Sequence, residues 1–483
     1  MNAECINSKD ECINTADKNL WAQNLTGIDL YRDNFKDHHK IKIGVWDLPT
    51  SIEKVKGIGP DLRKKLNQGN LNWEKAKKPD APEELEHAYL VSNLIAGVPS
   101  ISTGKSGVIT NIGVIENDGG GYKAILEDLK KYPELVPDLV NISHDNKPYD
   151  FDPAAKELKT YLKDTIFICS SGNYYPSKAD SEGDSPCIFV GSIADDGRVS
   201  EFSAEGRSVN ILAPADISIM SFDGKEPSKF GGTSAASPYV AGVVSDFLSE
   251  IYPLKIDRKK LVEILDKTSL KNQQNLKSSF SNAGIINSFK LHEVALRLKS
   301  NPELINSDSL FDFSKELNKD LMSAAVSLVQ MDCVKRKEAI KFLRKVFFLS
   351  AQNSIEQKDA AKALLAFDDN LVANKSFYES FIEKNKLDLG ELYKSDESTH
   401  SRIVRSLFDL FPSEDVIKGL ESDLNKLSGS ASVALMKELA KRNIRKDLIE
   451  KIMKDSPAKM DSGMSLKEWG DYLIERFMNV ENI

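Results

Sequence analysis

Short apolar runs alternate with helical patterns between about residue 41 and residue 299. Five of these runs are rich in β-branched or aromatic residues and are bounded by Gly, Pro, Asp or Ser: IKIGVWD (41–47), GVITNIGVI (107–115), PDLVNIS (137–143), TIFICSSG (165–172) and CIFVGSIA (187–194). Runs of this kind predict buried strands. Helical patterns from Ala124 to Lys131 and from Pro153 to Lys163 lie between them. The alternation predicts βαβ units in a parallel sheet, which binds ligands beyond the carboxyl ends of its strands.

From about residue 300 the strand signals fade, and apolar residues recur at helical spacing. Three sets each fall on one helical face: Ile340, Leu343, Val346 and Phe347; Ile403, Leu407, Leu410 and Phe411; and Leu435, Met436 and Leu439. This pattern predicts an all-α domain, either a bundle or a stack of helical repeats. Residues 1–40 are polar and charged, which predicts an extension with one short helix. We therefore expect an extension (1–40), an α/β domain (41–299) and a helical domain (300–483).

The composition is that of a globular protein, with 41% hydrophobic and 29% charged residues in a chain of 483. Lys and Arg are interleaved with Asp and Glu, and the formal net charge is −8, so we expect no binding to a polyanion. No stretch approaches the roughly 18 apolar residues that a membrane span needs.

The N-terminus lacks the basic start and apolar core of a secretory signal. This favours a cytoplasmic protein, or one exported without such a signal. The cysteines are odd in number and scattered, so we expect free thiols rather than a disulfide framework. They are Cys5, Cys12, Cys169, Cys187 and Cys333. Cys5 and Cys12 stay candidates for a bond in an oxidising compartment.

The most informative segment for chemistry is GGTSAASPYVAG, residues 231–242. Gly231 and Gly232 permit unusual backbone angles, and the small residues after them predict a tight turn feeding a helix. Ser234 would present its hydroxyl at the helix N-terminus, where free N–H groups and the helix dipole favour developing negative charge. Pro238 is tolerated in the first turns because those N–H groups lack helical partners. A plain Gly-rich turn capped by a hydroxyl residue is the alternative.

The pattern G-T-S-x-A-x-P, followed by V-A-G, resembles the nucleophile motif of the subtilase family. The family's motifs follow the order Asp, His, Asn, Ser, and this chain matches that order. Asp47 ends IGVWD, His87 lies in EHAYLVSNLIAG, and Asn173 lies in ICSSGN. NAGIINSFKLHEVA (282–295) resembles the segment that closes the family's catalytic domain. The resemblance covers about residues 41–299 and implies a subtilisin-like parallel sheet flanked by helices.

The resemblance also implies a serine endopeptidase that acts on polypeptides. Ser234 is expected to be the nucleophile, His87 the general base and Asp47 the carboxylate that orients the base. The Asn173 amide and the Ser234 backbone N–H are expected to hold the oxyanion. The chain has six histidines, and His87 alone lies at the start of a helical pattern between the Asp and Asn motifs.

Two further segments, GVIENDGGG and LVNISHD, resemble the strands that pair with the substrate backbone in this family. The residues expected to contact substrate are Gly119, Gly120, Gly121, Ser143, His144, Asp145, Ser170, Ser171 and Gly172. Asp145 replaces the Gly of the family's Ser-Leu-Gly pattern, which favours cleavage after Lys or Arg. A solvated carboxylate at the rim of the pocket is the alternative.

The chain departs from the family pattern beside the catalytic positions. Pro49 stands where the Asp motif has Gly, Ala88 and Tyr89 follow the His in place of Gly and Thr, and Asn93 and Ala215 replace other glycines. These changes add side-chain bulk, so we expect activity with a narrower cleft. No loop resembles the family's strong calcium site, so no metal or other cofactor is expected, and a calcium requirement stays open.

Residues 55–69, VKGIGPDLRKKLNQG, resemble a helix-hairpin-helix that can hold DNA phosphates. The acidic net charge favours a surface helix instead, and argues against nucleic acid as a partner.

The sequence leaves two functions open. One is an active endopeptidase whose helical C-terminal region binds a protein partner or regulates the protease. The other is a non-catalytic binding protein on a subtilase scaffold.

Overall fold

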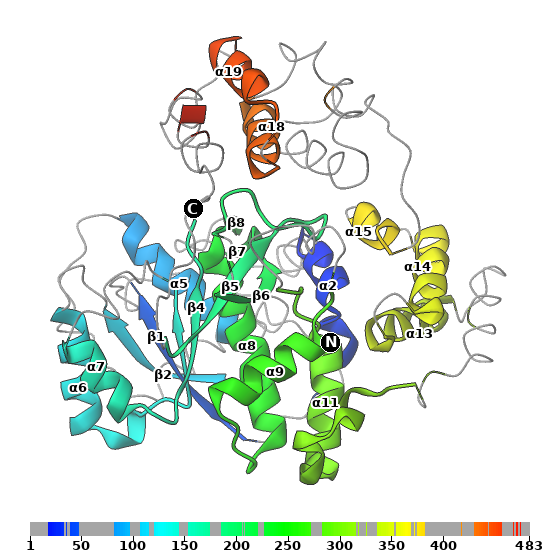
Figure 1. The fold of residues 1–483 in the computed structure, drawn as a ribbon. Helices are drawn as coiled ribbons and strands as arrows, with labels where there is room; N and C mark the ends of the chain where they lie inside the picture. Colours follow the sequence, from blue (N-terminus) through cyan, green and yellow to red (C-terminus); the bar gives the residue numbers. More distant parts are fainter. Residues whose placement is uncertain are drawn as a thin grey trace. The chain divides into compact units, whose positions relative to one another are not determined.

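A computed structural model describes most of residues 18–381 and part of the chain beyond them (Figure 1). The described residues are 18–32, 35, 39–47, 82–96, 107–114, 120–143, 153–173, 185–204, 206, 208–220, 227–271, 283–314, 317, 325, 336–351, 354–368, 371, 374–381, 417, 429–442, 444–455, 467, 470, 471 and 474. The chain divides into two compact units. The first comprises Met1–Leu276 and Phe280–Ile382, and the second comprises Lys277–Ser279 and Glu383–Ile483.

A six-stranded parallel sheet forms the centre of the first unit, in the order β2-β1-β3-β4-β5-β6. Its strands are β1 (Ile41–Asp47), β2 (Gly107–Val114), β3 (Leu139–Ile142), β4 (Ile166–Ser170), β5 (Cys187–Ile193) and β6 (Val209–Pro214). The first five coincide with the predicted apolar runs, whose β-branched residues suit a sheet buried on both faces. Because the strands run parallel, Asp47, Ser143 and Ser170 lie at the same edge of the sheet.

Helices cover both faces of this sheet, as predicted (Figure 1). α8 lies across β3 to β6, and α5 packs on β1, β2 and α8. α6 and α7 pack on each other over a second core that holds Trp46 and Phe167. A hairpin of β7 and β8 connects β6 to α8. The bounds are α5 (Pro82–Ala96), α6 (Gly120–Lys131), α7 (Pro153–Tyr161), β7 (Ile217–Met220), β8 (Pro227–Phe230), α8 (Thr233–Ile251), α9 (Arg258–Thr268) and α11 (Ser288–Ser300).

The N-terminal segment belongs to the first unit and packs into its core. It carries α2 (Leu20–Thr26) and α3 (Asp29–Arg32). Leu25, Leu30 and Tyr31 are buried in the same cluster as the residues of α8 and the sheet. The predicted short helix is therefore present, but it is part of the folded unit rather than a separate extension.

The chain from residue 300 to residue 382 belongs to the first unit and not to a separate helical domain. α13 (Arg336–Leu349), α14 (Ile355–Phe367) and α15 (Lys375–Glu379) lie in the first unit. Their apolar side chains join the core that holds α8 and α11. The units separate near residue 382, not near residue 299. Helical periodicity shows that one face is buried, but it does not show what covers that face.

Arg344 on α13 forms a two-pronged ion pair with Asp29 on α3, with N–O distances of 2.5 and 2.8 Å. The Arg344 side chain is 10% exposed and that of Asp29 is 29% exposed. Arg344→Met leaves Asp29 unpaired, so we expect the free energy of unfolding to fall by about 1–3 kcal/mol, less than for a fully buried pair. Urea unfolding measures this change. The control is Lys375→Met, which breaks an exposed pair with Glu379 and is expected to cost below about 0.5 kcal/mol. Equal effects of the two variants would contradict this account.

The second unit contains α18 (Gly429–Lys441) and α19 (Lys446–Asp455), which pack against each other. The predicted apolar face with Leu435, Met436 and Leu439 is buried on α18. The predicted face from Ile403 to Phe411 lies outside the described residues, as does the segment 55–69.

Cys169 on β4 and Cys187 on β5 form a disulfide, with an S–S distance of 2.12 Å. This differs from the free thiols expected from the sequence. The two residues are 18 positions apart but lie on neighbouring strands, where their Cα atoms are 5.7 Å apart.

In the described part of the chain, no helix is long and apolar enough to cross a membrane. Nor do the described residues include a cluster of three or more His, Cys, Asp or Glu side chains that could hold a metal ion.

Candidate active site

Asp47 and His87 lie side by side at the carboxyl edge of the sheet. Asp47 is the last residue of β1 and is fully buried, and His87 lies on α5. The Nδ1 atom of His87 is 2.8 Å from Oδ1 of Asp47 and 3.0 Å from Oδ2. A carboxylate in this place holds the imidazole in one orientation, with the proton on Nδ1 and a lone pair on Nε2.

The environment of His87 shifts its acid–base equilibrium in two opposing directions. Burial lowers the pKa of His87 as the largest single influence. The charge of Asp47 and its hydrogen bond raise the pKa, and together they outweigh burial, so the pKa lies above the usual 6.5. The ring of Phe230, the last residue of β8, stands edge-on to the His87 ring with centres 5.5 Å apart.

Ser234 is the second residue of α8, in the turn that its sequence predicts. Gly232 has a φ of +76°, a left-handed conformation that glycine adopts without strain, and the helix begins at Thr233. The Ser234 hydroxyl donates to the carbonyl of Ser143 at 3.0 Å. Among the described residues, no hydrogen bond joins Ser234 to His87. Contacts of this kind are often loose in a free enzyme and tighten when substrate binds.

Asn173 follows β4, and its side chain lies against the start of α8. Its Oδ1 atom accepts hydrogen bonds from the Thr233 N–H at 2.8 Å and from the Thr233 hydroxyl at 2.9 Å. These bonds occupy the amide oxygen, so the Nδ2 group remains as a donor near Ser234. A Cβ atom at Gly232 would lie 3.0 Å from Nδ2, so a side chain there would press on the Asn173 amide, and the positive φ favours glycine in any case. The sequence did not indicate this role of Thr233, and the only available signal was its place beside Ser234.

The residues expected to contact substrate fall into three groups. Ser143, Ser170 and Ser171 are buried. Gly172 is half-buried, and its N–H donates to the Thr233 hydroxyl at 3.2 Å. Gly120 and Gly121 begin α6. Gly119, His144 and Asp145 lie outside the described residues. The structure therefore brings the ends of β3 and β4 to Ser234.

Side chains that are bulkier than the family's usual residues at the same positions lie in the core. Tyr89 and Asn93 are 2% and 0% exposed. The Asn93 amide lies 3.4 Å from the Tyr89 hydroxyl, one helical turn away. Ala215 is also buried. These three substitutions therefore affect the packing of the core behind the site. From the sequence, a narrower cleft had been expected instead.

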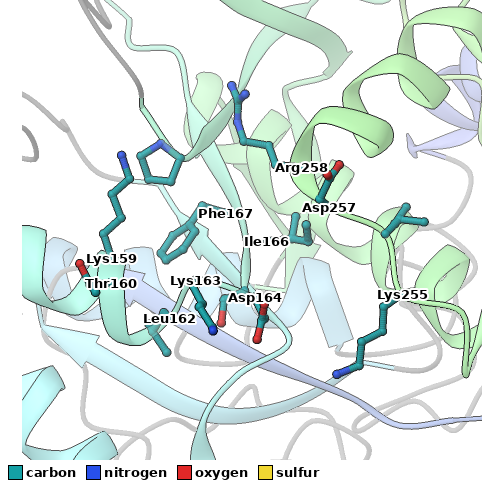
Figure 2. Close-up of a pocket in the computed structure, with 13 residues that line it drawn as sticks. Lys159, Thr160, Leu162, Lys163, Asp164, Ile166, Phe167, Lys255, Asp257 and Arg258 are labelled. Carbon is teal, nitrogen blue, oxygen red and sulfur yellow. The ribbon is translucent and has the colours of Figure 1, made fainter.

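A cavity of about 540 Å³ lies at the other edge of the sheet (Figure 2). Its lining residues include Ile166, the first residue of β4, and Arg258, the first residue of α9. Its charges are mixed, with Lys163 and Lys255 near Asp164 and Asp257, and the Arg258 guanidinium donates to the Cys187 carbonyl at 2.8 and 3.1 Å. This cavity is separate from the site around Asp47 and Ser234.

Comparison with known proteins matches the same part of the chain that carries the sequence motifs described above. The model of the Subtilase family, peptidases of the S8 type, matches residues 33–282. The major intracellular serine protease of Bacillus subtilis is 26% identical over 219 residues, which are 42% of this chain and 68% of that protein. Subtilisin DY of Bacillus licheniformis is 26% identical over 183 residues, which are 35% of this chain and 64% of that protein.

The chain thus matches about two thirds of the length of these relatives. A crystal structure of a cold-adapted subtilisin-like serine proteinase is 20% identical, with a TM-score of 0.38, over 52% of this chain and 90% of that one. The family match spans more than half of the 483 residues and contains the positions Asp47, His87, Asn173 and Ser234. This chain belongs to the subtilase family, the subtilisin-like serine proteases.

Proposed function

We propose that this protein hydrolyses peptide bonds with Ser234 as nucleophile, His87 as general base, Asp47 as the orienting carboxylate and Asn173 as oxyanion donor. The observation that carries the proposal is the pair of Asp47 and His87, joined at 2.8 Å, with the His87 ring against Phe230, which leads into the turn that presents Ser234. A fully buried carboxylate bonded to an imidazole that is 25% exposed suits a base that is fixed on one side and open on the other.

The reaction then follows from the positions of these groups. Rotation of the Ser234 hydroxyl away from the Ser143 carbonyl lets it donate to Nε2 of His87. His87 takes the proton as Ser234 Oγ attacks the substrate carbonyl carbon, and it returns the proton to the leaving amine. Water then attacks the acyl-enzyme in the same way, with His87 again as the base, which releases the acid product and restores Ser234.

A fluorophosphonate probe tests the assignment of Ser234. We expect it to phosphonylate Ser234 in the full chain, to leave Ser234→Ala unlabelled, and to give an adduct that mass spectrometry locates in residues 231–242. The alternative is a non-catalytic binding protein on a subtilase scaffold, which the bond from Ser234 to Ser143 favours. A folded full-length chain that takes no label and hydrolyses no peptide would support that alternative.

The pH dependence of kcat/KM tests the pairing of His87 with Asp47. His87 acts as a base only when it is neutral, so activity rises as pH rises through its pKa. Since Asp47 raises that pKa, we expect the midpoint of this rise above 6.5 in the wild-type enzyme. In Asp47→Asn, burial acts without the opposing charge, so we expect the midpoint below 6.5. Equal midpoints in the two proteins would contradict this pairing.

Asn173→Ala tests the oxyanion donor. We expect kcat to fall by about two to three orders of magnitude with little change in KM, because the amide acts on the charge that develops in the transition state. This magnitude is the one known from subtilisin itself. Thr233→Val keeps the Asn173 amide but removes one of the two bonds that orient it, so we expect a smaller loss. A larger loss in Thr233→Val than in Asn173→Ala would contradict these roles.

The substrate-binding residues are proposed from the family resemblance. Ser143, His144 and Asp145 after β3, Ser170 to Gly172 at the end of β4, and Gly119 to Gly121 at the start of α6 would flank the peptide on both sides of Ser234. Cleavage after Lys or Arg remains a proposal that rests on Asp145. A peptide library in which Asp145→Gly leaves the preference unchanged would reject it.

The chain's relatives also bear on where it acts. Two of them are named as intracellular serine proteases, from Bacillus subtilis and Paenibacillus polymyxa. We propose the same location for this chain, and a protein partner for the helical residues beyond 382. The disulfide between Cys169 and Cys187 is typical of an oxidising compartment, whereas a reducing cytosol keeps thiols reduced, so alkylation of the two cysteines in rapidly quenched cells tests the location. Complete protection of both thiols would argue for an oxidising compartment.

A further inference from the structure

The hairpin β7–β8 is a two-stranded ribbon, four residues long in each strand, that adjoins the proposed catalytic residues. Phe230 at its end is 5% exposed and packs edge-on against the His87 ring. Gly231, Gly232 and Thr233 then lead directly into Ser234. A shift of this hairpin would therefore disturb both His87 and Ser234.

In the described part of the chain, the side chain of Asn19 pairs with the outer edge of this ribbon at Ser218. A two-stranded ribbon is marginally stable by itself, and its edges present unpaired N–H and C=O groups. Ser218, which lies opposite Lys229 in the ribbon, has both of its backbone groups bonded to Asn19. The Asn19 amide nitrogen donates to the Ser218 carbonyl at 2.8 Å, and the amide oxygen accepts the Ser218 N–H at 2.8 Å. The Asn19 side chain thus takes the place of a third strand.

Asn19 is held in register by the helix that it precedes. Asn19 is 5% exposed and Ser218 is half-buried, so a lost bond would leave a partly buried backbone group of Ser218 without its Asn19 partner. On α2, the Asn24 amide donates to the Asn374 side-chain oxygen at 3.2 Å. Asn374 in turn donates to the Trp21 carbonyl at 3.2 Å and to the Asp195 carbonyl at 2.7 Å. α2 is therefore anchored through Asn374, and Asn19, the residue before α2, contacts β7.

We propose that Asn19 is a positioning residue of the protease, an inference that rests on the function proposed above. By pairing with both backbone groups of Ser218, Asn19 fixes the β7–β8 hairpin, and the hairpin fixes His87 through Phe230 and Ser234 through the turn at Gly231. Asn19 contacts neither substrate nor any reacting atom. The N-terminal segment thus supports catalysis from outside the part of the chain that carries the four proposed catalytic side chains.

Two variants separate the hydrogen bonds of Asn19 from its packing. Asn19→Ala removes both bonds, whereas Asn19→Asp keeps the shape and the acceptor but sets a carboxylate oxygen against the Ser218 carbonyl. At about pH 8, where an aspartate is ionised, we expect kcat to fall about tenfold in Asn19→Ala and at least as far in Asn19→Asp, with KM within about twofold. Wild-type kcat in Asn19→Asp would show that only packing matters and would overturn the proposal.

Asn24→Ala is the matched control, because it removes a buried amide bond on the same helix without touching the hairpin. We expect it to lower the thermal midpoint about as much as Asn19→Ala does, with kcat within about twofold of the wild type. If both variants lose kcat equally, the effect is general destabilisation of α2, and the proposal is overturned.

Hydrogen exchange separates this proposal from the protease function itself. We expect the amides of β7 to exchange about tenfold faster in Asn19→Ala than in the wild type, with the amides of β1 and β4 unchanged. Unchanged exchange in β7 would overturn the proposal. A wild-type protein that takes no fluorophosphonate and cleaves no peptide would instead contradict the protease function, and the exchange of β7 would still decide whether Asn19 holds the hairpin.

Discussion

Ser234→Ala is expected to lower kcat for peptide hydrolysis by about six orders of magnitude, the loss that the same change causes in subtilisin itself. The hydroxyl is the atom that forms the acyl-enzyme, so its removal leaves only binding and the oxyanion donors. His87→Ala is expected to cause about the same loss, because the hydroxyl is a weak nucleophile without its base. The double variant should therefore be no slower than either single variant.

Single-turnover and steady-state kinetics on one peptide substrate measure these losses. Ser245→Ala is the matched control, since Ser245 lies on the same helix and, among the described residues, its hydroxyl bonds only to the Gly242 carbonyl of that helix, at 2.7 Å. We expect its kcat to stay within about twofold of the wild type. Additive losses in the double variant would mean that Ser234 and His87 act independently, which would contradict the proposed mechanism.

Ending the chain after residue 299 is expected to abolish cooperative folding. The residues between 301 and 382 bury many large apolar side chains in the core of the first unit, among them Leu310, Phe313, Leu343, Val346, Phe347, Phe348, Leu364, Phe377, Tyr378 and Phe381. At about 2 kcal/mol for each buried side chain, these ten contribute on the order of 20 kcal/mol as an upper estimate. That exceeds the roughly 5–15 kcal/mol by which a domain is usually stable.

Ending the chain after residue 382 is the matched comparison, because it keeps the first unit intact and removes most of the second. We expect residues 1–382 to unfold in one cooperative transition, and residues 1–299 to bind a hydrophobic dye and show no such transition. A folded, active 1–299 fragment would show that α13 to α15 are dispensable, and would restore the predicted boundary near residue 299.

Much of the site was predictable because it consists of local motifs joined to a regular sheet. IKIGVWD, TIFICSSG and GGTSAASP each combine an apolar strand or helix start with a polar residue at its end. Parallel strands place such ends at one edge, so Asp47 and Ser170 were expected to lie near the turn that carries Ser234. Local pattern and global topology agree here, since the predicted strands form a parallel sheet and bring Asp47 and Ser170 to one edge.

The rest depends on contacts between residues far apart in the chain, which periodicity cannot show. Asn19 and Ser218 are 199 positions apart, and Arg344 and Asp29 are 315 apart. Cys169 and Cys187 meet because β4 and β5 are neighbouring strands. The spacing of the cysteines along the chain does not predict this pairing.

The sequence by itself determined the first five strands, the parallel sheet that they imply and the residue types of a serine protease, because each depends on a short stretch of chain. Only the tertiary structure decided which surfaces those elements cover. It placed the buried apolar side chains of α2, α3, α13, α14 and α15 in the core of the first unit, where an extension and a separate helical domain had been expected. The physical reason is that an amphipathic face specifies burial without specifying its partner. The partner is chosen by the packing of the whole unit.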